Sequence, residues 1–203
     1  MELVKYNNNS ISSVTALDSI ASGSLVLLAT NTITSGVSSS SFTSNIDSTY
    51  DTYLFKFINI HPATDSQHLQ VNFRDGSSAF DATKTTTSWY AYHGESGGTD
   101  LTYLTGLDLA QSTSYQSISG TVGNLNDESF SGEMFLFSPS STTFVKHFIV
   151  RGNTYSQNDL SADMYFAGYC NVTAAIDGVD FKFGSGNIDS GVIKMFGLSK
   201  SWV

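Results

Sequence analysis

The residues that could carry chemistry in this chain are four histidines, one cysteine and several serine-rich and glycine-rich segments. No two histidines have the close spacing that is typical of zinc ligands. The serine-rich segments 38–41 and 138–143 lack the GxSxG turn that exposes a nucleophile. The segment GSGNIDSG at 184–191 contains no lysine, so it does not match a phosphate-binding loop. The four histidines are His61, His68, His93 and His147.

Two acidic segments could offer oxygen ligands to calcium, or a carboxylate pair for glycoside hydrolysis. They are NLNDE at 124–128 and GNIDSG at 186–191, and neither matches the twelve-residue loop of an EF-hand. Asp127 and Glu128 fall in an expected loop, where solvation of both carboxylates is the simpler interpretation. The sequence therefore predicts no catalytic residue, no metal site and no cofactor.

Aromatic residues offer a different kind of site. They crowd an expected strand that precedes a glycine-rich turn, where aromatic rings can stack on sugars or fill a protein interface. The alternative is that one face of each strand belongs to the core, which accounts for about half of them. These candidate contact residues are Trp89, Tyr90, Tyr92, His93 and Tyr103. Towards the two ends of the chain, the candidates are Leu3, Val4, Tyr6 and Trp202.

Composition and charge exclude several classes of partner. The 203 residues include only 9 Lys plus Arg against 18 Asp plus Glu, a formal net charge of −9. Nucleic acid and anionic membrane surfaces require clustered basic residues, so neither is an expected partner. No apolar run approaches the length of a bilayer span. The first residues lack the basic and apolar parts of a secretory signal, which predicts synthesis in the cytoplasm.

The single cysteine, Cys170, rules out an internal disulfide, so packing alone must stabilise the fold. Cys170 shares one side of an expected strand with Met164 and Phe166, which predicts a buried thiol that packs as a small hydrophobic residue. Aromatic residues make up 13% of the chain, enough to build a substantial core rather than a disordered segment.

The elements that must position these residues are strands. Alternating apolar and polar residues, separated by turn signals, predict about ten strands and no helix. So many strands in one chain must form two packed sheets or a barrel. We therefore expect an all-β fold, a β-sandwich with jelly-roll topology as the first choice. Residues 23–203 are expected to form this single domain, and residues 1–22 an extended N-terminal arm used for attachment.

Three local patterns predict how particular strands are placed and paired. Both faces of TYLFKFINI at 52–60 are largely apolar, which predicts a central strand covered on both sides. The segment SPSS at 138–141 separates two apolar runs and predicts a hairpin. At the end of the chain, the runs 178–183 and 191–198 are expected to pair across the loop at 184–191, with the last strand deep in a sheet.

Three segments carry a family resemblance: DSTYDTYLFKFINIHPATDSQHLQVNFRDGSSAFDATKTTT at 47–87, FSPSSTTFVKHFIVRGNTY at 137–155 and AGYCNVTAAIDGVDFKFGSGNIDSGVIKMFGL at 167–198. Together they resemble virion proteins of tailed bacteriophages, particularly those of marine phages. The resemblance spans about residues 47 to 198. It implies a surface β-domain of a phage particle, assembled in the host cytoplasm, with other virion proteins of the capsid, tail or baseplate as partners. It also implies a homo-oligomer, with a trimer favoured.

Three functions compete at this point. The first is a tail-fibre or receptor-binding module that touches a glycan of the host surface through its loops. The second is a capsid-decoration protein that coats or stabilises the head. The third is a polysaccharide-degrading enzyme, which would need two carboxylates facing one cleft. Without such a pair in the sequence, we expect a protein that is not an enzyme.

Overall fold

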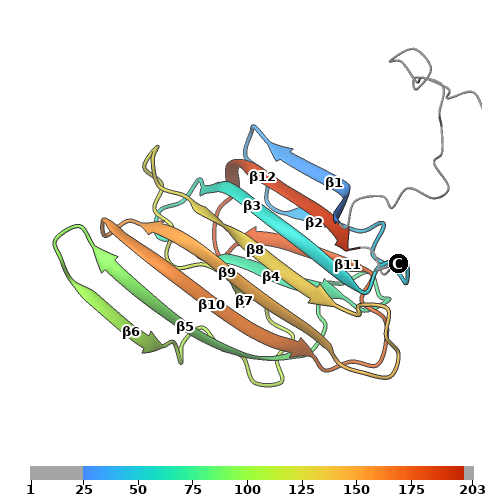
Figure 1. The fold of residues 1–203 in the computed structure, drawn as a ribbon. Coiled ribbons are helices and arrows are strands. Elements are labelled where there is room, and N and C mark those ends of the chain that lie inside the picture. The colour runs from blue at the N-terminus through green and yellow to red at the C-terminus, as the bar shows by residue number, and fades with distance from the viewer. Residues whose placement is uncertain (1–24, 199–203) are drawn as a thin grey trace, which may run out of the picture.

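The computed structural model describes residues 25–198, which form twelve β-strands and no helix (Figure 1). The predicted all-β fold is confirmed, with two more strands than expected. Accordingly, these residues contain no helix long and apolar enough to cross a membrane. The strands are β1 (Leu25–Ile33), β2 (Ser40–Phe42), β3 (Thr52–Pro62), β4 (Leu69–Arg74), β5 (Lys84–Gly94), β6 (Thr99–Tyr103), β7 (Gln116–Ser117), β8 (Phe130–Phe137), β9 (Lys146–Ser156), β10 (Leu160–Cys170), β11 (Gly178–Phe183) and β12 (Ile188–Leu198).

Eight of the strands form a jelly roll. The first pairs with the last (β1 with β12), and the next pairs inward are β2 with β11, β3 with β8 and β4 with β7. The contacts of β12 with β3 and of β11 with β4 join these pairs into two antiparallel sheets. Strands from the two ends of the chain thus pair in nested order and alternate between the two sheets, which is the jelly-roll topology that the sequence predicted.

The other four strands extend one of the two sheets. β9, β10, β5 and β6 follow β8, so the large sheet has eight strands in the order β1-β12-β3-β8-β9-β10-β5-β6. The small sheet has four, in the order β2-β11-β4-β7. In Figure 1 the small sheet lies behind the large one, and β5 and β6 lie at the edge remote from β1. Four strands cannot cover eight, so connecting segments must cover the inner face of the extension.

The core lies between the two sheets and is rich in phenylalanine. Phe181 of the small sheet contacts the rings of Phe42, Phe55 and Phe57 edge-on, at centroid distances of 5.1 to 6.3 Å. All four side chains are buried. Aromatic edge-to-face pairs add stability beyond the area that they bury, so this cluster fixes how the two sheets face each other.

Close backbone packing under Phe130 requires glycine at one position of the sheet. Gly132 of β8 and Gly152 of β9 are paired in register. A Cβ atom added to Gly152 would lie 2.4 Å from the ring of Phe130 and 2.9 Å from the backbone oxygen of Ser131. Any side chain there would displace the ring or separate the strands.

One local prediction was right only in part, and one was wrong. β3 is a central strand between β12 and β8, as predicted, but it is not fully covered on both sides, because Ile58 is exposed on the outer face whereas Leu54 is buried there. The last two strands do not pair with each other, since β11 belongs to the small sheet and β12 to the large one. The loop between them crosses from sheet to sheet, which explains its length. The hairpin around 138–141 is confirmed, because β8 and β9 pair directly.

Residues 1–24 and 199–203 lie outside the described residues. The predicted arm at 1–22 therefore falls outside them, as do both ends of the predicted domain.

Candidate functional site

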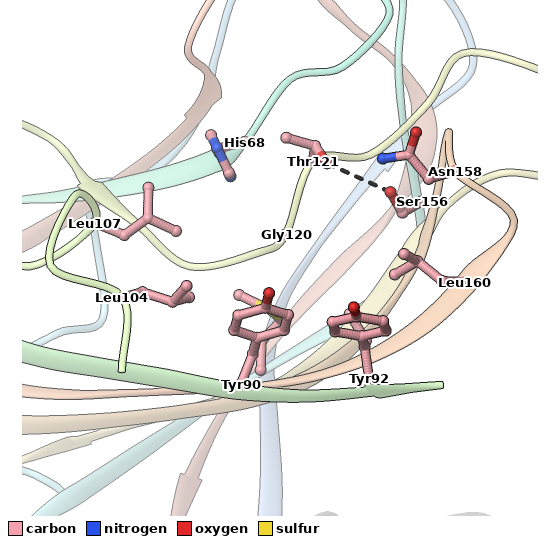
Figure 2. Close-up of a pocket in the computed structure, with 12 residues that line it drawn as sticks. His68, Tyr90, Tyr92, Leu104, Leu107, Gly120, Thr121, Ser156, Asn158 and Leu160 are labelled. Atoms are coloured by element: carbon pink, nitrogen blue, oxygen red, sulfur yellow. Dashed lines mark hydrogen bonds between the residues drawn. The ribbon is translucent and has the colours of Figure 1, made fainter. Parts of the chain in front are cut away.

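A cavity of about 400 Å³ lies on the inner face of the sheet extension. Its floor is β5 and β10, and its roof is the pair of connecting segments that flank β7 (Figure 2). Pockets of roughly 300–1,000 Å³ that combine apolar walls with a few polar groups are the usual sites for small ligands. The apolar lining residues are Leu104, Leu107, Leu160, Ala162 and Met164, and the polar ones are His68, Tyr90, Tyr92, Thr121, Ser156 and Asn158.

Two parallel tyrosine rings form the most prominent part of this floor. Tyr90 and Tyr92 are two residues apart on β5, so both side chains point to the inner face. Their rings are stacked at a centroid distance of 5.5 Å and an interplanar angle of 12°. Figure 2 shows both rings rising from β5 toward the cavity. The register with β10 places Met164 beside Tyr90 and Ala162 beside Tyr92, which supports both rings from the neighbouring strand.

The segment 104–122 is held over this floor by specific hydrogen bonds. Leu104 N donates to Ser88 O, and Ser88 Oγ donates back to Leu104 O, each at 2.9 Å. Gly120 N donates to the Thr154 side-chain oxygen at 3.0 Å. These bonds join the roof to β5 and β9, so the cavity is preformed rather than created by ligand binding.

Polar groups line the rim opposite the tyrosines. His68 Nδ1 donates to Ser119 O at 2.9 Å, because a carbonyl oxygen can only accept, and in the neutral ring this leaves Nε2 as an acceptor. Thr121 Oγ1 and Ser156 Oγ are 3.4 Å apart. The amide of Asn158 has no hydrogen-bond partner among the described residues, and neither hydroxyl of the two tyrosines has one. The rim can therefore both donate to and accept from a ligand.

Among the described residues that line the cavity there is no carboxylate, lysine or arginine. Burial raises the pKa of Tyr90 above its ordinary value, and the nearby Asp100 and Tyr92 raise it further, so this hydroxyl stays protonated and neutral. A neutral site with hydroxyl and amide groups favours an uncharged ligand, because it offers no counter-charge for a buried anion or cation.

The sequence candidates divide between two faces of the sheet. Tyr90 and Tyr92 line the cavity, whereas Trp89, His93 and Tyr103 lie on the opposite, outer face. Trp89 stacks there on Tyr165 at a centroid distance of 4.2 Å. The remaining candidates, Leu3, Val4, Tyr6 and Trp202, lie outside the described residues.

Several cavity residues were not singled out from the sequence. Leu104, Leu107, Thr121 and Asn158 come from connecting segments, and no periodic pattern marks them. The sequence indicates His68 only as a possible metal ligand. Its position just before β4 gives no sign that it meets Tyr90 of β5, which lies 22 residues further along the chain.

The two acidic segments do come together, in a separate hollow beside His61. His61 Nδ1 lies 3.6 Å from a carboxylate oxygen of Asp189. Glu128 is buried, and its carboxylate accepts a hydrogen bond from Leu125 N at 2.6 Å, so the prediction that it is solvated was wrong. Among residues 25–198, no group of three His, Cys, Asp or Glu residues is arranged to hold a metal ion.

A second buried polar cluster lies at the other end of the extension. Cys170 is paired in register with Lys84 on one side and Lys146 on the other, and all three residues are buried. Burial lowers the pKa of Lys84 to about 8 and raises the pKa of Cys170 to about 12. The prediction of a buried thiol is confirmed. A thiol with so high a pKa is a poor nucleophile at neutral pH.

No protein-family model matches this chain, and no curated protein sequence matches it. The assignment of a function therefore depends on the geometry of the cavity and on the sequence patterns described above.

Proposed function

We propose that this chain is a surface module of a phage virion that binds an uncharged saccharide of the host surface in the cavity above Tyr90 and Tyr92. The observation that carries this proposal is a preformed, uncharged cavity that combines two stacked tyrosines with a hydroxyl, amide and imidazole rim. The resemblance of the segments at 47–87, 137–155 and 167–198 to virion proteins supports the location on a particle.

Saccharides have two kinds of surface, and the cavity offers a match for both. A pyranose ring presents a face of C–H groups, which packs on an aromatic ring without loss of hydrogen bonds to water. Its hydroxyl groups need partners that donate and accept, since an unpaired buried hydroxyl costs about 1–3 kcal/mol. Asn158, Thr121, Ser156 and His68 supply such partners on the side opposite the tyrosines.

The net negative charge of the chain argues against an anionic saccharide as the ligand. An anionic sugar would enter a neutral cavity of a protein with net charge −9, without a lysine or arginine to pair with. A neutral hexose or N-acetylhexosamine meets no such barrier. The proposed ligand is therefore a neutral unit of a bacterial surface polysaccharide rather than an acidic one.

Binding of defined polysaccharides to the full chain tests this proposal. We expect the chain to bind neutral bacterial glycans on an array, and calorimetry to give about tenfold or greater weakening for Tyr92→Ala, or ~1.4 kcal/mol. His93→Ala is the matched control, because His93 neighbours Tyr92 on β5 and points to the outer face. Equal affinities of Tyr92→Ala and the wild type, or binding of acidic glycans alone, would overturn the assignment.

The location on the particle is tested separately. Immunogold electron microscopy of intact virions with an antibody against this chain should label the tail or its tip if the module binds the receptor. Label spread over the head would instead support the decoration function. Particles without any label would rule out both virion roles.

A further inference from the structure

The outer face of the large sheet carries an ordered row of side chains that crosses all eight strands. From the β12 side to the β5 side, the paired positions in this row are Lys194, Lys56, Glu133, Arg151, Tyr165 and Trp89. Thr30 of β1 and Tyr103 of β6 complete it at the two edges. Within one chain, Lys56 pairs with Glu133, and the guanidinium of Arg151 lies 4.9 Å from the ring centroid of Tyr165.

A second row on the same face is apolar. It runs through Leu27, Phe196, Leu54, Phe135, Ile149 and Ala167 on six consecutive strands. Leu27 is 53% exposed and Ile149 is 45% exposed, whereas Leu54 between them is only 6% exposed, and none of the residues 25–198 forms a further layer over this row (Figure 1). An uncovered face with rows of aromatic and aliphatic residues has the composition of an interface core.

The size of this face is sufficient for a stable contact. Eight strands at a spacing of about 4.8 Å span roughly 34 Å, and strands of about ten residues are roughly 33 Å long. The projected area of about 1,100 Å² exceeds the ~800 Å² per partner that a typical specific interface buries. Because the sheet is twisted, only part of this area can contact a partner, so the area must exceed the ~800 Å² that is needed.

The charges favour a second copy of the chain over an oppositely charged partner. The middle of the outer face carries three cations (Lys56, Arg151 and Lys194) and two carboxylates (Glu133 and Asp163), for a local net charge of +1. The whole chain has a net charge of −9, so the rest of it carries −10. Two copies repel each other least when they approach through this face.

We propose that two copies of this chain pack outer face to outer face around a two-fold axis that runs parallel to the strands between β8 and β9. This axis lies at the middle of the eight-position row, so it places each position against its mirror position on the partner. Glu133 then faces Arg151 of the second copy, Lys56 faces Tyr165 and Lys194 faces Trp89. The apolar row likewise meets itself, with Phe135 against Ile149.

In this arrangement each position of the row meets its counterpart on the second copy, so one surface serves for both copies. The central contact between Glu133 and Arg151 is an ion pair made twice. Within each copy, Trp89 stacks on Tyr165 from β5 and the guanidinium of Arg151 contacts it from β9, so Lys56 and Lys194 of the second copy meet this stack from its solvent side. An isologous contact of this kind closes at two copies, unlike the trimer that the sequence resemblance implies. The cavity of each copy lies on the opposite face of its large sheet and stays open, so the contact does not depend on the proposed saccharide site.

Charge reversal tests this arrangement in the full chain. Sedimentation velocity of the wild type over a range of concentrations should give a dimer. Glu133→Arg alone or Arg151→Glu alone sets like charges against each other and should raise the dimer dissociation constant at least tenfold. The double variant Glu133→Arg/Arg151→Glu brings opposite charges together again and should regain most of the affinity.

Lys182→Glu is the matched control, because Lys182 lies on the small sheet and reverses the same amount of charge away from the contact. It should leave the dimer unchanged. Circular dichroism melting curves must first show that each variant is folded, because Glu133 and Arg151 are also cross-strand neighbours within one chain, and the double variant restores that contact as well. Only the dissociation constants of folded variants test the contact between two copies. A monomeric wild type, a trimer insensitive to both reversals, or a double variant no better than the single ones would overturn the proposal.

Discussion

The surroundings of Lys84 allow us to predict how the free energy of unfolding depends on pH. Its side chain is fully buried, and Nζ donates to Ala82 O at 3.0 Å and Ser114 O at 2.7 Å. Within residues 25–198 no carboxylate is in hydrogen-bonding contact with it. Burial therefore disfavours the charged form and lowers the pKa from 10.5 to about 8. We propose to replace it by Lys84→Met, which keeps the length of the side chain and removes the titrating group.

The sign of the effect follows from proton binding. Between pH 8 and 10.5 the unfolded chain keeps the proton on Lys84, whereas the folded protein loses it. The unfolded state then binds more protons, so the free energy of unfolding rises with pH. For these two pKa values the linkage relation gives about 1 kcal/mol of added stability at pH 9 relative to pH 7. The lowered pKa of Lys146 acts in the same direction.

Cys170 sets the upper limit of this window. Burial raises its pKa from 9.0 to about 12, so above pH 9 the unfolded chain loses the thiol proton first and stability falls with pH. The rise caused by Lys84 should therefore be clearest between pH 7 and pH 9 and level off above it.

Urea unfolding at pH 7, 8 and 9 and constant ionic strength measures this effect. Lys84→Met leaves two carbonyl groups without a donor, which lowers stability by a similar amount at every pH. Only the difference between the wild-type and variant pH profiles is therefore diagnostic. That difference should grow by about 1 kcal/mol from pH 7 to pH 9. A constant difference across this range would refute the buried, weakly basic state of Lys84.

Two further predictions concern packing. Gly152→Ala places a methyl group against the ring of Phe130 and should destabilise the fold by about 1–3 kcal/mol, or roughly 2–10 °C in Tm. Gly98→Ala is its control, because no atom lies within 4 Å of the added Cβ, and a large effect there would contradict the steric argument. Phe181→Ala removes the centre of the aromatic cluster and should cost about 3–5 kcal/mol in urea unfolding. Phe144→Ala, at a 73% exposed loop residue, should change stability by less than ~0.5 kcal/mol, and comparable losses for both would show that Phe181 is not at the centre of the core.

Strand positions followed largely from local pattern. The alternation in LQVNFR at 69–74 predicted inward Leu69, Val71 and Phe73, and all three are fully buried. Such a pattern depends only on the period of two along a strand, which any β-sheet shares. The same reasoning failed for the outer face of β3, because apolar residues such as Ile58 can face an uncovered surface as well as a core.

The sequence pattern could not show which face of β5 is the inner one, and therefore which of its aromatic candidates line the cavity. Tyr90 and Tyr92 alternate with Trp89 and His93, so the sequence placed the two pairs on opposite faces without indicating which face is inside. Coverage by the segment at 104–122 decides this, and that segment has no periodic signal.

The sequence alone determined the strand-rich class, the absence of a disulfide and the acidic character of this protein, because these depend on composition and on residues two positions apart. The tertiary structure alone decided that β11 and β12 lie in different sheets and that His68, Tyr90, Gly120 and Ser156 meet around one cavity. Those residues are separated by 22 to 36 positions from one to the next. Only strand pairing and sheet packing bring such distant residues together, and no local pattern encodes which strands will pair.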